Sequence, residues 1–477
     1  MKKATSTFKT TFNKSCKTAL MLALSLGVAA GSLSACSDSD GNGNGNANQG
    51  QQGQQGQQGK GGDSLSPNLI KSALSRAESN VADADRDAFV KGQYDLNFDL
   101  IRKSADQIGD DNAMISTFSI QTALAMTWAG ANGDTASEMA SALHFDDNTH
   151  AALNKLDSLI ISKNKDKYSK EVAEGVFDEK EAVEIKTNND LYFAPSGYEW
   201  SSDWLDVLAT NYGAGLTELN FAADPEAARK YINDIVSADT HDRIKDLLPQ
   251  NSIDNNTKAV ITNAIYFKAP WRDEVHKAGN KLSFQKLDGS KVDVDSLYVA
   301  ANYEYMADDN NLYQAVSVPL RDNDFKVLFV LPADGKFNDV QAALSGDVVG
   351  SIFSKLAVDP EIELKFPSYS FETSLSLKDP LRDLGMLKAF ENGIADFSKM
   401  TSDPNDLFIA DIFHKTFIGL DENGVEAAAA TAVVMAENAA PVQDIIKLDL
   451  DRPYFFIIYE SDSRTPLFVG RVMDPSK

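Results

Sequence analysis

A stretch almost without apolar residues divides this chain of 477 residues and decides which part of it can fold. Residues 37–66 consist mainly of Gly, Asn, Gln, Ser and Asp and include the repeat QQGQQGQQG. Such a composition cannot build a hydrophobic core. From Pro67 to Lys477 the composition is that of a globular protein, with no second low-complexity break. We therefore expect one large folded domain at 67–477.

The N-terminal residues have the pattern of an export signal. A basic stretch at 1–17 precedes an apolar run at 18–31, which is shorter than the ~20 residues of a membrane-spanning helix. The sequence LSAC that ends at Cys36 resembles the lipobox of bacterial lipoproteins, in which the cysteine is acylated and becomes the new N-terminus. We expect a lipoprotein signal peptide at 1–35 and a lipid anchor on Cys36. The alternatives are an ordinary leader with a chance cysteine and a retained transmembrane anchor.

The expected lipid anchor, the flexible spacer and the negative charge together predict where in the cell the protein is located. A flexible linker at 36–66 has a mean reach of roughly 30 Å, enough to hold the domain clear of a membrane. The formal charge of −25 opposes binding to nucleic acid or to anionic lipid. We expect an exported protein, lipid-anchored to the cell envelope, and Ser37 after the cysteine favours the outer membrane or cell surface over the inner membrane. Without the anchor the protein would be extracellular.

Apolar spacing predicts an α+β domain with antiparallel or mixed sheets, because helical patterns come first and strand patterns accumulate later. Helices are expected over 94–108 and over 120–145, the latter divided by Gly130 and Gly133. Strands are expected over 258–267, 313–318, 326–331, 361–366, 407–418 and 454–459.

Motifs of catalysis are missing from the sequence. The five histidines form no HExxH, and the chain has no GxSxG elbow before a helix, no phosphate loop and no GxGxxG after a strand. Acid pairs such as Asp110 and Asp111 fit a solvated surface better than glycoside hydrolysis in so acidic a chain. The sequence therefore predicts neither an enzyme nor a bound metal or cofactor.

The segment 422–434, ENGVEAAAATAVV, is the most unusual part of the domain. By itself EAAAA favours a helical turn. However, it follows the strand pattern FIADIFHKTFIGL and ends in TAVV, which favours a strand. Small side chains between β-forming residues suit a segment that slides between packed neighbours, because neither face carries bulk.

This segment resembles the hinge of the serpins, and the resemblance extends over about 92–477. Six blocks in the family's order carry it: ISTFSI at 115–120 with ALAM and GANGDT after it, IND at 232–234, IKDL at 244–247, NAIYFK at 263–268 with Trp271, DRPYFFI at 451–457, and LFVGRV at 467–472. The chain departs from the family at Thr117, at 269–270 and at Val425. Valine at the hinge is compatible with insertion, since it is apolar and β-favouring.

The resemblance implies a serpin fold, with mixed β-sheets, about eight to nine helices and an exposed reactive-centre loop. It also implies an inhibitor that acts as a suicide substrate of a serine or cysteine endopeptidase: the protease attacks the loop, forms an acyl-enzyme, and the cleaved loop inserts into the main sheet. No cofactor or metal is implied.

The resemblance also implies roles for individual residues. The hinge comprises Glu422, Gly424, Val425, Glu426, Ala427, Ala428, Ala429, Ala430 and Thr431. The polar shutter under the opening sheet comprises Ser116, Ser119, Asn263 and His414, and Trp271 marks the breach where the loop first enters. For His414 the strand pattern alone predicts the more apolar face and a need for a hydrogen-bond partner.

The reactive bond follows from the family's hinge spacing. Counting from Glu422 places the bond between Asn438 and Ala439, within a window of 435–441. Since no Lys or Arg occurs over 416–446, trypsin-like proteases are not the expected targets, and enzymes that accept small or medium residues are. Two alternatives stay open: a non-inhibitory, serpin-fold surface binding lipoprotein, and a tethered binding protein or glycan hydrolase that uses the fold only as a scaffold.

Overall fold

The computed structural model describes residues 65–176, 182–195, 197–402, 407–426 and 445–477. All of them belong to one compact unit, Gly61–Lys477. The leader, Cys36 and most of the spacer lie outside the described residues. Among the described residues, none of the helices has the length and hydrophobicity of a membrane span.

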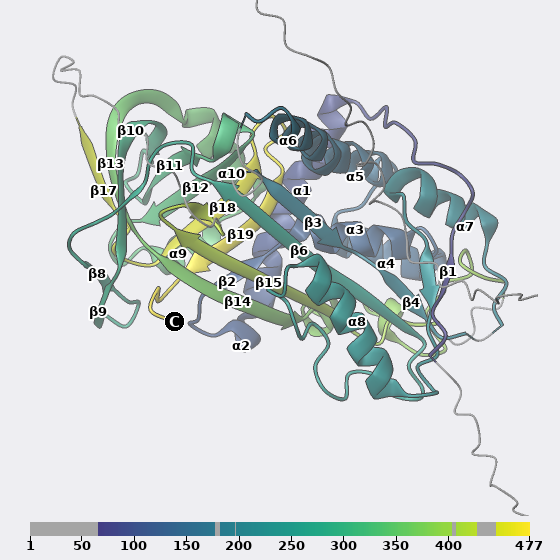
Figure 1. Ribbon diagram of the computed structural model, residues 1–477. Coiled ribbons are helices and arrows are strands. Elements are labelled where there is room, and N and C mark those ends of the chain that lie inside the picture. Colours follow the sequence, from purple (N-terminus) through teal and green to yellow (C-terminus); the bar gives the residue numbers. More distant parts are fainter. Residues whose placement is uncertain (1–64, 177–181, 196, 403–406, 427–444) are drawn as a thin grey trace, which may run out of the picture. The chain divides into compact units, whose positions relative to one another are not determined.

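An eight-stranded sheet dominates the described part of the chain (Figure 1). Its strand order is β1 (Asn68–Ile70), β5 (Leu216–Glu218), β4 (Leu191–Phe193), β6 (Ala259–Pro270), β16 (Gly424–Val425), β15 (Ile412–Asp421) and β14 (Tyr369–Ser376), with β3 (Glu184–Asn188) also paired to β6. Strands β6 and β15 also pair directly with each other, in parallel.

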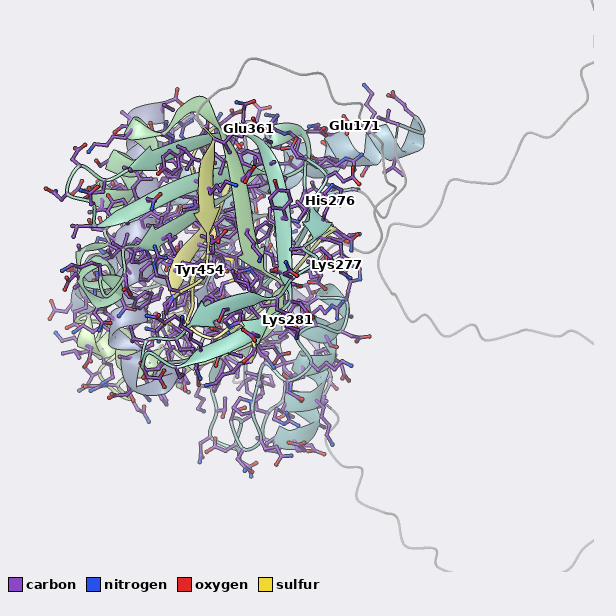
Figure 2. The ribbon with its side chains drawn as sticks, turned by 90° about the vertical axis from the view of Figure 1, so that its left-hand side faces the viewer. Glu171, His276, Lys277, Lys281, Glu361 and Tyr454 are labelled. Atoms are coloured by element: carbon purple, nitrogen blue, oxygen red, sulfur yellow. The ribbon has the colours of Figure 1, made fainter. Side chains whose placement is uncertain are left out.

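A nine-stranded sheet forms the second layer of strands. Its order is β17 (Ile446–Asp449), β13 (Ala357–Pro367), β10 (Ser296–Ala307), β11 (Tyr313–Pro319), β12 (Phe325–Pro332), β18 (Tyr454–Glu460), β19 (Pro466–Val472) and β2 (Ala113–Ile115), with β7 (His276–Lys277) also paired to β10. A separate hairpin joins β8 (Leu282–Gln285) and β9 (Lys291–Val294). Figure 2 shows this side of the molecule, with β7 marked by His276 and Lys277.

Helices cover both faces of the eight-stranded sheet, with α8 on the near face in Figure 1 and α3 behind it. The helices are α1 (Asp83–Lys103), α2 (Ala105–Ile108), α3 (Thr117–Trp128), α4 (Gly133–Leu143), α5 (Thr149–Asp157), α6 (Lys163–Ala173), α7 (Ser202–Val207), α8 (Pro225–Asp239), α9 (Phe337–Ala343), α10 (Gly346–Lys355) and α11 (Lys378–Asp383). The mixed α+β architecture expected from the sequence is confirmed.

Local sequence explains where the two helices next to the site begin. Asp224 caps α8 by accepting a hydrogen bond from the amide of Ala227 at 3.0 Å, and Pro225 occupies the first turn, where no amide donor is needed. Ser116 caps α3 in the same manner, through the amide of Ser119 at 3.4 Å. The two caps fix the starting points of the helices on opposite faces of the sheet.

The expected strands are confirmed with small shifts at their ends, and two elements differ more. The helix expected over 94–108 begins earlier, at Asp83, and is divided into α1 and α2 at Ser104. The sequence did not indicate the early start, because the first six residues of α1, DADRDA, carry no apolar periodicity. The strand expected over 407–418 runs from Ile412 to Asp421. The short strands β1 to β5 gave no recognisable pattern, since most of them have only three residues.

Candidate functional site

At the centre of the eight-stranded sheet β6 and β15 lie next to each other, and we call the line between them the seam. At one end of the seam the two strands pair directly, and at the other end β16 lies between them. Four residue pairs, from Ile412 with Ile261 to Lys415 with Ala264, join the strands directly. Further along, β16 lies between them. Gly424 pairs with Pro270 on β6 and with Asp421 on β15, and Val425 pairs with Ala269 and with Leu420. The first part of the predicted hinge is therefore already a strand of the sheet.

A tight turn carries the chain from β15 into β16. Asp421 Oδ1 accepts a hydrogen bond from the amide of Asn423 at 2.7 Å. Gly424 has φ 147°, and a Cβ there would lie 2.2 Å from the carbonyl oxygen of Ala269. Only glycine fits this position, because the backbones approach too closely for any side chain.

Trp271, the predicted breach residue, closes the end of the seam where β16 enters. Its indole Nε1 donates to the carbonyl of Asp421 at 2.8 Å, and its amide donates to the carbonyl of Asn423 at 3.2 Å. Glu422, in the turn between them, pairs at 2.8 Å with Lys277 of β7. Lys277 is labelled in Figure 2. These contacts hold the turn against the nine-stranded sheet.

Val425 and Glu426 point to opposite faces of the sheet. Val425 is 2% exposed and belongs to the main hydrophobic core, so the departure from the family at this position replaces a hydroxyl with a well-buried apolar group. The side chain of Glu426 is 8% exposed and pairs with Arg243, in the segment after α8. Burial raises the pKa of Glu426, and Arg243 acts in the opposite direction.

The four predicted shutter residues lie together beneath the seam. His414 Nδ1 lies 2.6 Å from Asn263 Oδ1, and His414 Nε2 accepts a hydrogen bond from the amide of Ser116 at 3.2 Å. Asn263 Nδ2 donates to Ser119 Oγ and to Asn189 Oδ1, both at 2.8 Å. Asn189 was not predicted, because an asparagine between two short strands carries no sequence signal.

The partners of His414 define its protonation state. Because Nε2 accepts from a backbone amide, the ring proton is on Nδ1 and is donated to Asn263 Oδ1. Burial lowers the pKa of His414 to about 3, so the ring is neutral at neutral pH. The predicted alternation is confirmed: residues 412, 414, 416, 418 and 420 are buried, and those between them are partly exposed.

The remaining predicted site residues, Ala427, Ala428, Ala429, Ala430, Thr431, Asn438, Ala439 and Cys36, lie outside the described residues. No group of His, Cys, Asp and Glu in the described ranges could hold a metal ion.

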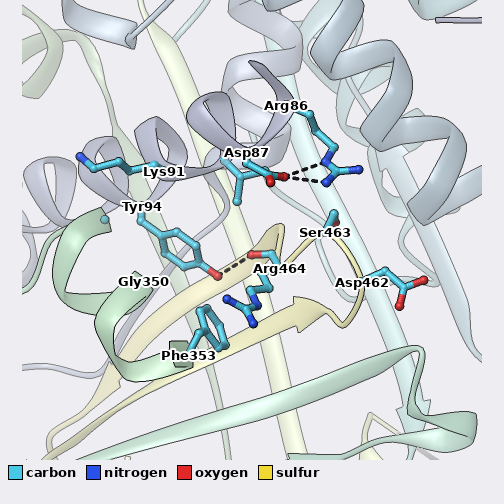
Figure 3. A pocket seen from close by; sticks show the side chains of 11 residues that line it. Arg86, Asp87, Lys91, Tyr94, Gly350, Phe353, Asp462, Ser463 and Arg464 are labelled. Carbon is cyan, nitrogen blue, oxygen red and sulfur yellow. Dashed lines mark hydrogen bonds and ion pairs between the residues drawn. The ribbon is translucent and has the colours of Figure 1, made fainter. Parts of the chain in front are cut away.

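A cavity of about 350 Å³ lies at a different place, between α1, α10 and the turn after β18 (Figure 3). Tyr94 of α1 and Phe353 of α10 face it, and the guanidinium of Arg464 lies 5.1 Å from the centre of the Phe353 ring. Tyr94 donates to the carbonyl of Arg464 at 2.7 Å. No residue of the seam lines this cavity.

The fold and the seam define a class of α+β protein in which a short strand, β16, lies between β6 and β15 of the central sheet. A family model described as Serpin (serine protease inhibitor) matches residues 91–475. The chain belongs to the serpin family. Many serpins inhibit proteases, and some do not.

Relatives of known sequence agree over most of the chain. A serpin-like protein of Thermococcus kodakarensis is 33% identical over 384 residues, which are 80% of this chain and 84% of that protein. Human serpin B4 is 31% identical over 399 residues, 82% of this chain and 99% of that protein. The leukocyte elastase inhibitor of Xenopus tropicalis is 29% identical over 392 residues, 80% of this chain and 97% of that protein.

Solved structures share the fold. The native state of the thermophilic serpin tengpin has a TM-score of 0.70 and 24% identity, and the match covers 85% of this chain and 99% of tengpin. A thyroxine-binding globulin in complex with thyroxine has a TM-score of 0.66 and 24% identity, and the match covers 81% of this chain and 99% of the globulin.

Proposed function

We propose that this protein is a suicide-substrate inhibitor of serine or cysteine endopeptidases. The observation that carries the proposal is the position of Gly424 and Val425, which already form a strand between β6 and β15. The loop that follows them is therefore connected to the one seam of the described sheet into which it could continue.

The covalent step uses the protease's own chemistry. Its serine hydroxyl or cysteine thiol gives its proton to the protease's base, and the oxygen or sulfur bonds to the carbonyl carbon of Asn438. The C–N bond to Ala439 breaks, and the departing amine takes the proton. An ester or thioester then links the protease to Asn438, and insertion of the cleaved loop must occur before water hydrolyses this bond.

The observed register predicts where an inserted strand would lie. Continued in the register of β16, Thr431 would face Asn263 on β6 and His414 on β15, and Met435 would face Ala259, the first residue of β6. Asn438 would follow about 10 Å beyond the sheet. Insertion in this register would carry the protease from one end of the seam to the other.

Opening the seam requires a replacement for one buried hydrogen bond. Separating β6 from β15 by one strand spacing, ~4.8 Å, breaks the bond between His414 and Asn263, and both side chains are fully buried. On an alternating strand, Thr431 would point to the same face as Val425, the core face. Its hydroxyl could accept from His414 Nδ1 and donate to Asn263 Oδ1, so neither group would be left unpaired.

The energy of insertion is large enough to distort a trapped enzyme. Extension of β16 from Glu426 to Met435 would add on the order of ten ladder hydrogen bonds at about 1 kcal/mol each. That total is comparable with the 5–15 kcal/mol that stabilises a typical protease domain. The acyl-enzyme can therefore be held in a form that hydrolyses slowly.

The target and the location are further parts of the proposal. The absence of Lys and Arg from 416–446 supports targets that accept small or medium residues, not trypsin-like enzymes. An anchor on Cys36 and the linker 36–66 would keep the inhibitor at the envelope surface, where it meets proteases from outside the cell.

A second candidate function is the binding of a small molecule, and the cavity beside Arg464 favours it. An aromatic wall of Tyr94 and Phe353 next to a guanidinium suits an aromatic anion. Thyroxine-binding globulin, which has the same fold, was solved in complex with thyroxine. Titration of the protein with thyroxine, followed by calorimetry, tests this candidate; absence of binding in Arg464→Glu would locate the ligand in the cavity.

The proposed function is tested by incubation with a panel of elastase-like, subtilisin-like, trypsin-like and papain-like proteases. An SDS-stable band at the summed mass of the two chains is expected with at least one enzyme outside the trypsin-like group. Cleavage of the loop by every enzyme without such a band would contradict inhibition.

A further inference from the structure

We propose that Arg243 is a positioning residue that keeps the loop, as it inserts, in the register begun by Gly424 and Val425, by holding Glu426 at the point where β16 ends. The inference rests on the proposed function, because it concerns the step after the acyl-enzyme has formed.

Glu426 directly follows β16, at the end of the paired part of the hinge. Its amide donates to the carbonyl of Gly419 at 2.7 Å, which is the next ladder bond after the Val425 pair on β15. Its φ of 50° departs from the extended conformation of a strand. One backbone rotation at Glu426 would continue β16, since the preceding residues already have the final pairing.

Arg243 holds the carboxylate of Glu426 on the face covered by α8. Its guanidinium lies 5.3 Å from the centre of the Phe417 ring, and Phe417 packs against Ile244 and Leu247 of the same segment. His241 and Lys268 also lie near the carboxylate and, like Arg243, act to lower the pKa of Glu426. Arg243 is therefore fixed by an aromatic ring of β15 and by its own segment while it binds the hinge.

The ion pair is compatible with the state after insertion as well as the state before it. Val425 points into the core, so Glu426 in an extended strand points to the α8 face, where Phe417 and Arg243 already lie. Rotation of the Glu426 backbone leaves its carboxylate on this side of the sheet. Arg243 can thus hold Glu426 throughout insertion and does not have to release it.

The sequence after Glu426 explains why the hinge needs such a contact. Residues 427–430 are four alanines, and identical small side chains fit the seam equally well after a slip of two residues. A slip would move Thr431 away from Asn263 and His414. Glu426 is the charged residue adjacent to this run, so its pair with Arg243 distinguishes the correct register from its neighbours.

The test measures how the acyl-enzyme divides between trapping and hydrolysis. In Arg243→Met, insertion in the correct register is expected to slow, so the number of inhibitor molecules consumed per protease trapped should rise severalfold, while the rate of loop cleavage stays the same. Glu426→Gln should give the same result. Arg243→Lys should retain most of the trapping, and the double exchange Arg243→Glu with Glu426→Arg should recover part of it.

A matched control separates positioning from general stability. Lys355→Met, at the end of α10 and away from the seam, breaks an ion pair of 2.7 Å with Asp309, which lies between β10 and β11. This variant should leave the stoichiometry unchanged. Unchanged stoichiometry in Arg243→Met would overturn the inference while the proposed function stands. If the unsubstituted protein traps no protease, amide hydrogen exchange provides the test. Faster exchange at the Val425 and Glu426 amides in Arg243→Met would support the inference that Arg243 holds the hinge. Unchanged exchange would refute it.

Discussion

His414 on β15 and Asn263 on β6 face each other across the seam and share a hydrogen bond of 2.6 Å, although a strand inserted between their strands would separate them. Both side chains are fully buried. The bond therefore stabilises the closed seam and has to be replaced when the seam opens. Three predictions concern this pair and the segment expected to displace it, and a fourth concerns the anchor.

The first prediction is a pH dependence of stability that originates from His414. Its folded pKa of about 3 lies below the usual 6.5, so the unfolded chain binds a proton that the native state excludes. Between pH 6.5 and pH 3 the free energy of unfolding should fall as pH falls, by up to about 1.4 kcal/mol per pH unit from this group. Above pH 6.5 this contribution is constant.

Urea unfolding of the unsubstituted protein and of His414→Gln, from pH 7.5 to pH 4.5, checks it. The difference in unfolding free energy between the two proteins should shrink on acidification, because only one of them contains His414. Carboxylates contribute equally to both proteins. A difference that stays constant with pH would show that the buried ring does not exclude the proton.

The second prediction follows from the faces of β16. Since Val425 points into the core, an inserted strand would direct Ala427 into the core and Ala428 toward α8. A buried unpaired charge costs several kcal/mol. Ala428→Arg should leave the loop cleavable and slow its insertion, so that inhibitor becomes substrate, and Ala427→Arg should do so more strongly. Gel densitometry of complex against cleaved product measures both, and equal complex yields from all three proteins would exclude insertion in this register.

The third prediction concerns Thr431. Thr431→Val keeps the shape of the side chain and removes the hydroxyl expected to bridge His414 and Asn263 after insertion. The uncleaved protein should keep its stability, whereas the loop-cleaved protein should lose about 1–3 kcal/mol, the cost of buried groups left unpaired. Denaturant unfolding of both forms provides the measurement. Thr431→Ser, which keeps the hydroxyl, is the control and should lose less.

The fourth prediction tests the anchor separately from inhibition. Cys36→Ala should release a soluble protein that still traps its protease, because acylation needs the thiol and the folded domain begins beyond the linker. Fractionation of cells grown with labelled fatty acid measures attachment. Label or membrane pelleting retained by Cys36→Ala would disprove the assignment of Cys36.

The alternation of apolar and polar residues predicted the strands around the seam. The resemblance to the serpin family indicated which polar residues lie beneath it. Alternation along 412–420 was sufficient to place His414 on the buried face. The ordered blocks of the family brought Ser116, Ser119 and Asn263 into consideration together, although Asn263 and His414 are 151 residues apart.

Contacts between distant segments without a motif could not be predicted. Arg243 and Glu426 are 183 residues apart, and an arginine after a helix has the same sequence pattern whether it faces solvent or a hinge. Likewise, the sequence favours a strand after Gly424 without showing how far that strand has entered the sheet. Both features depend on the packing of α8 and β15, which only the three-dimensional arrangement provides.

The most direct test of the central claim is mass spectrometry of the peptide released when an SDS-stable complex is denatured. Insertion in the observed register predicts a covalent complex and a C-terminal fragment that begins at Ala439, or elsewhere within 436–442 if the count from Glu422 is shifted. Efficient complex formation through cleavage after Lys447 would contradict the account, because residues up to Asp449 already belong to β17 and could not enter the seam.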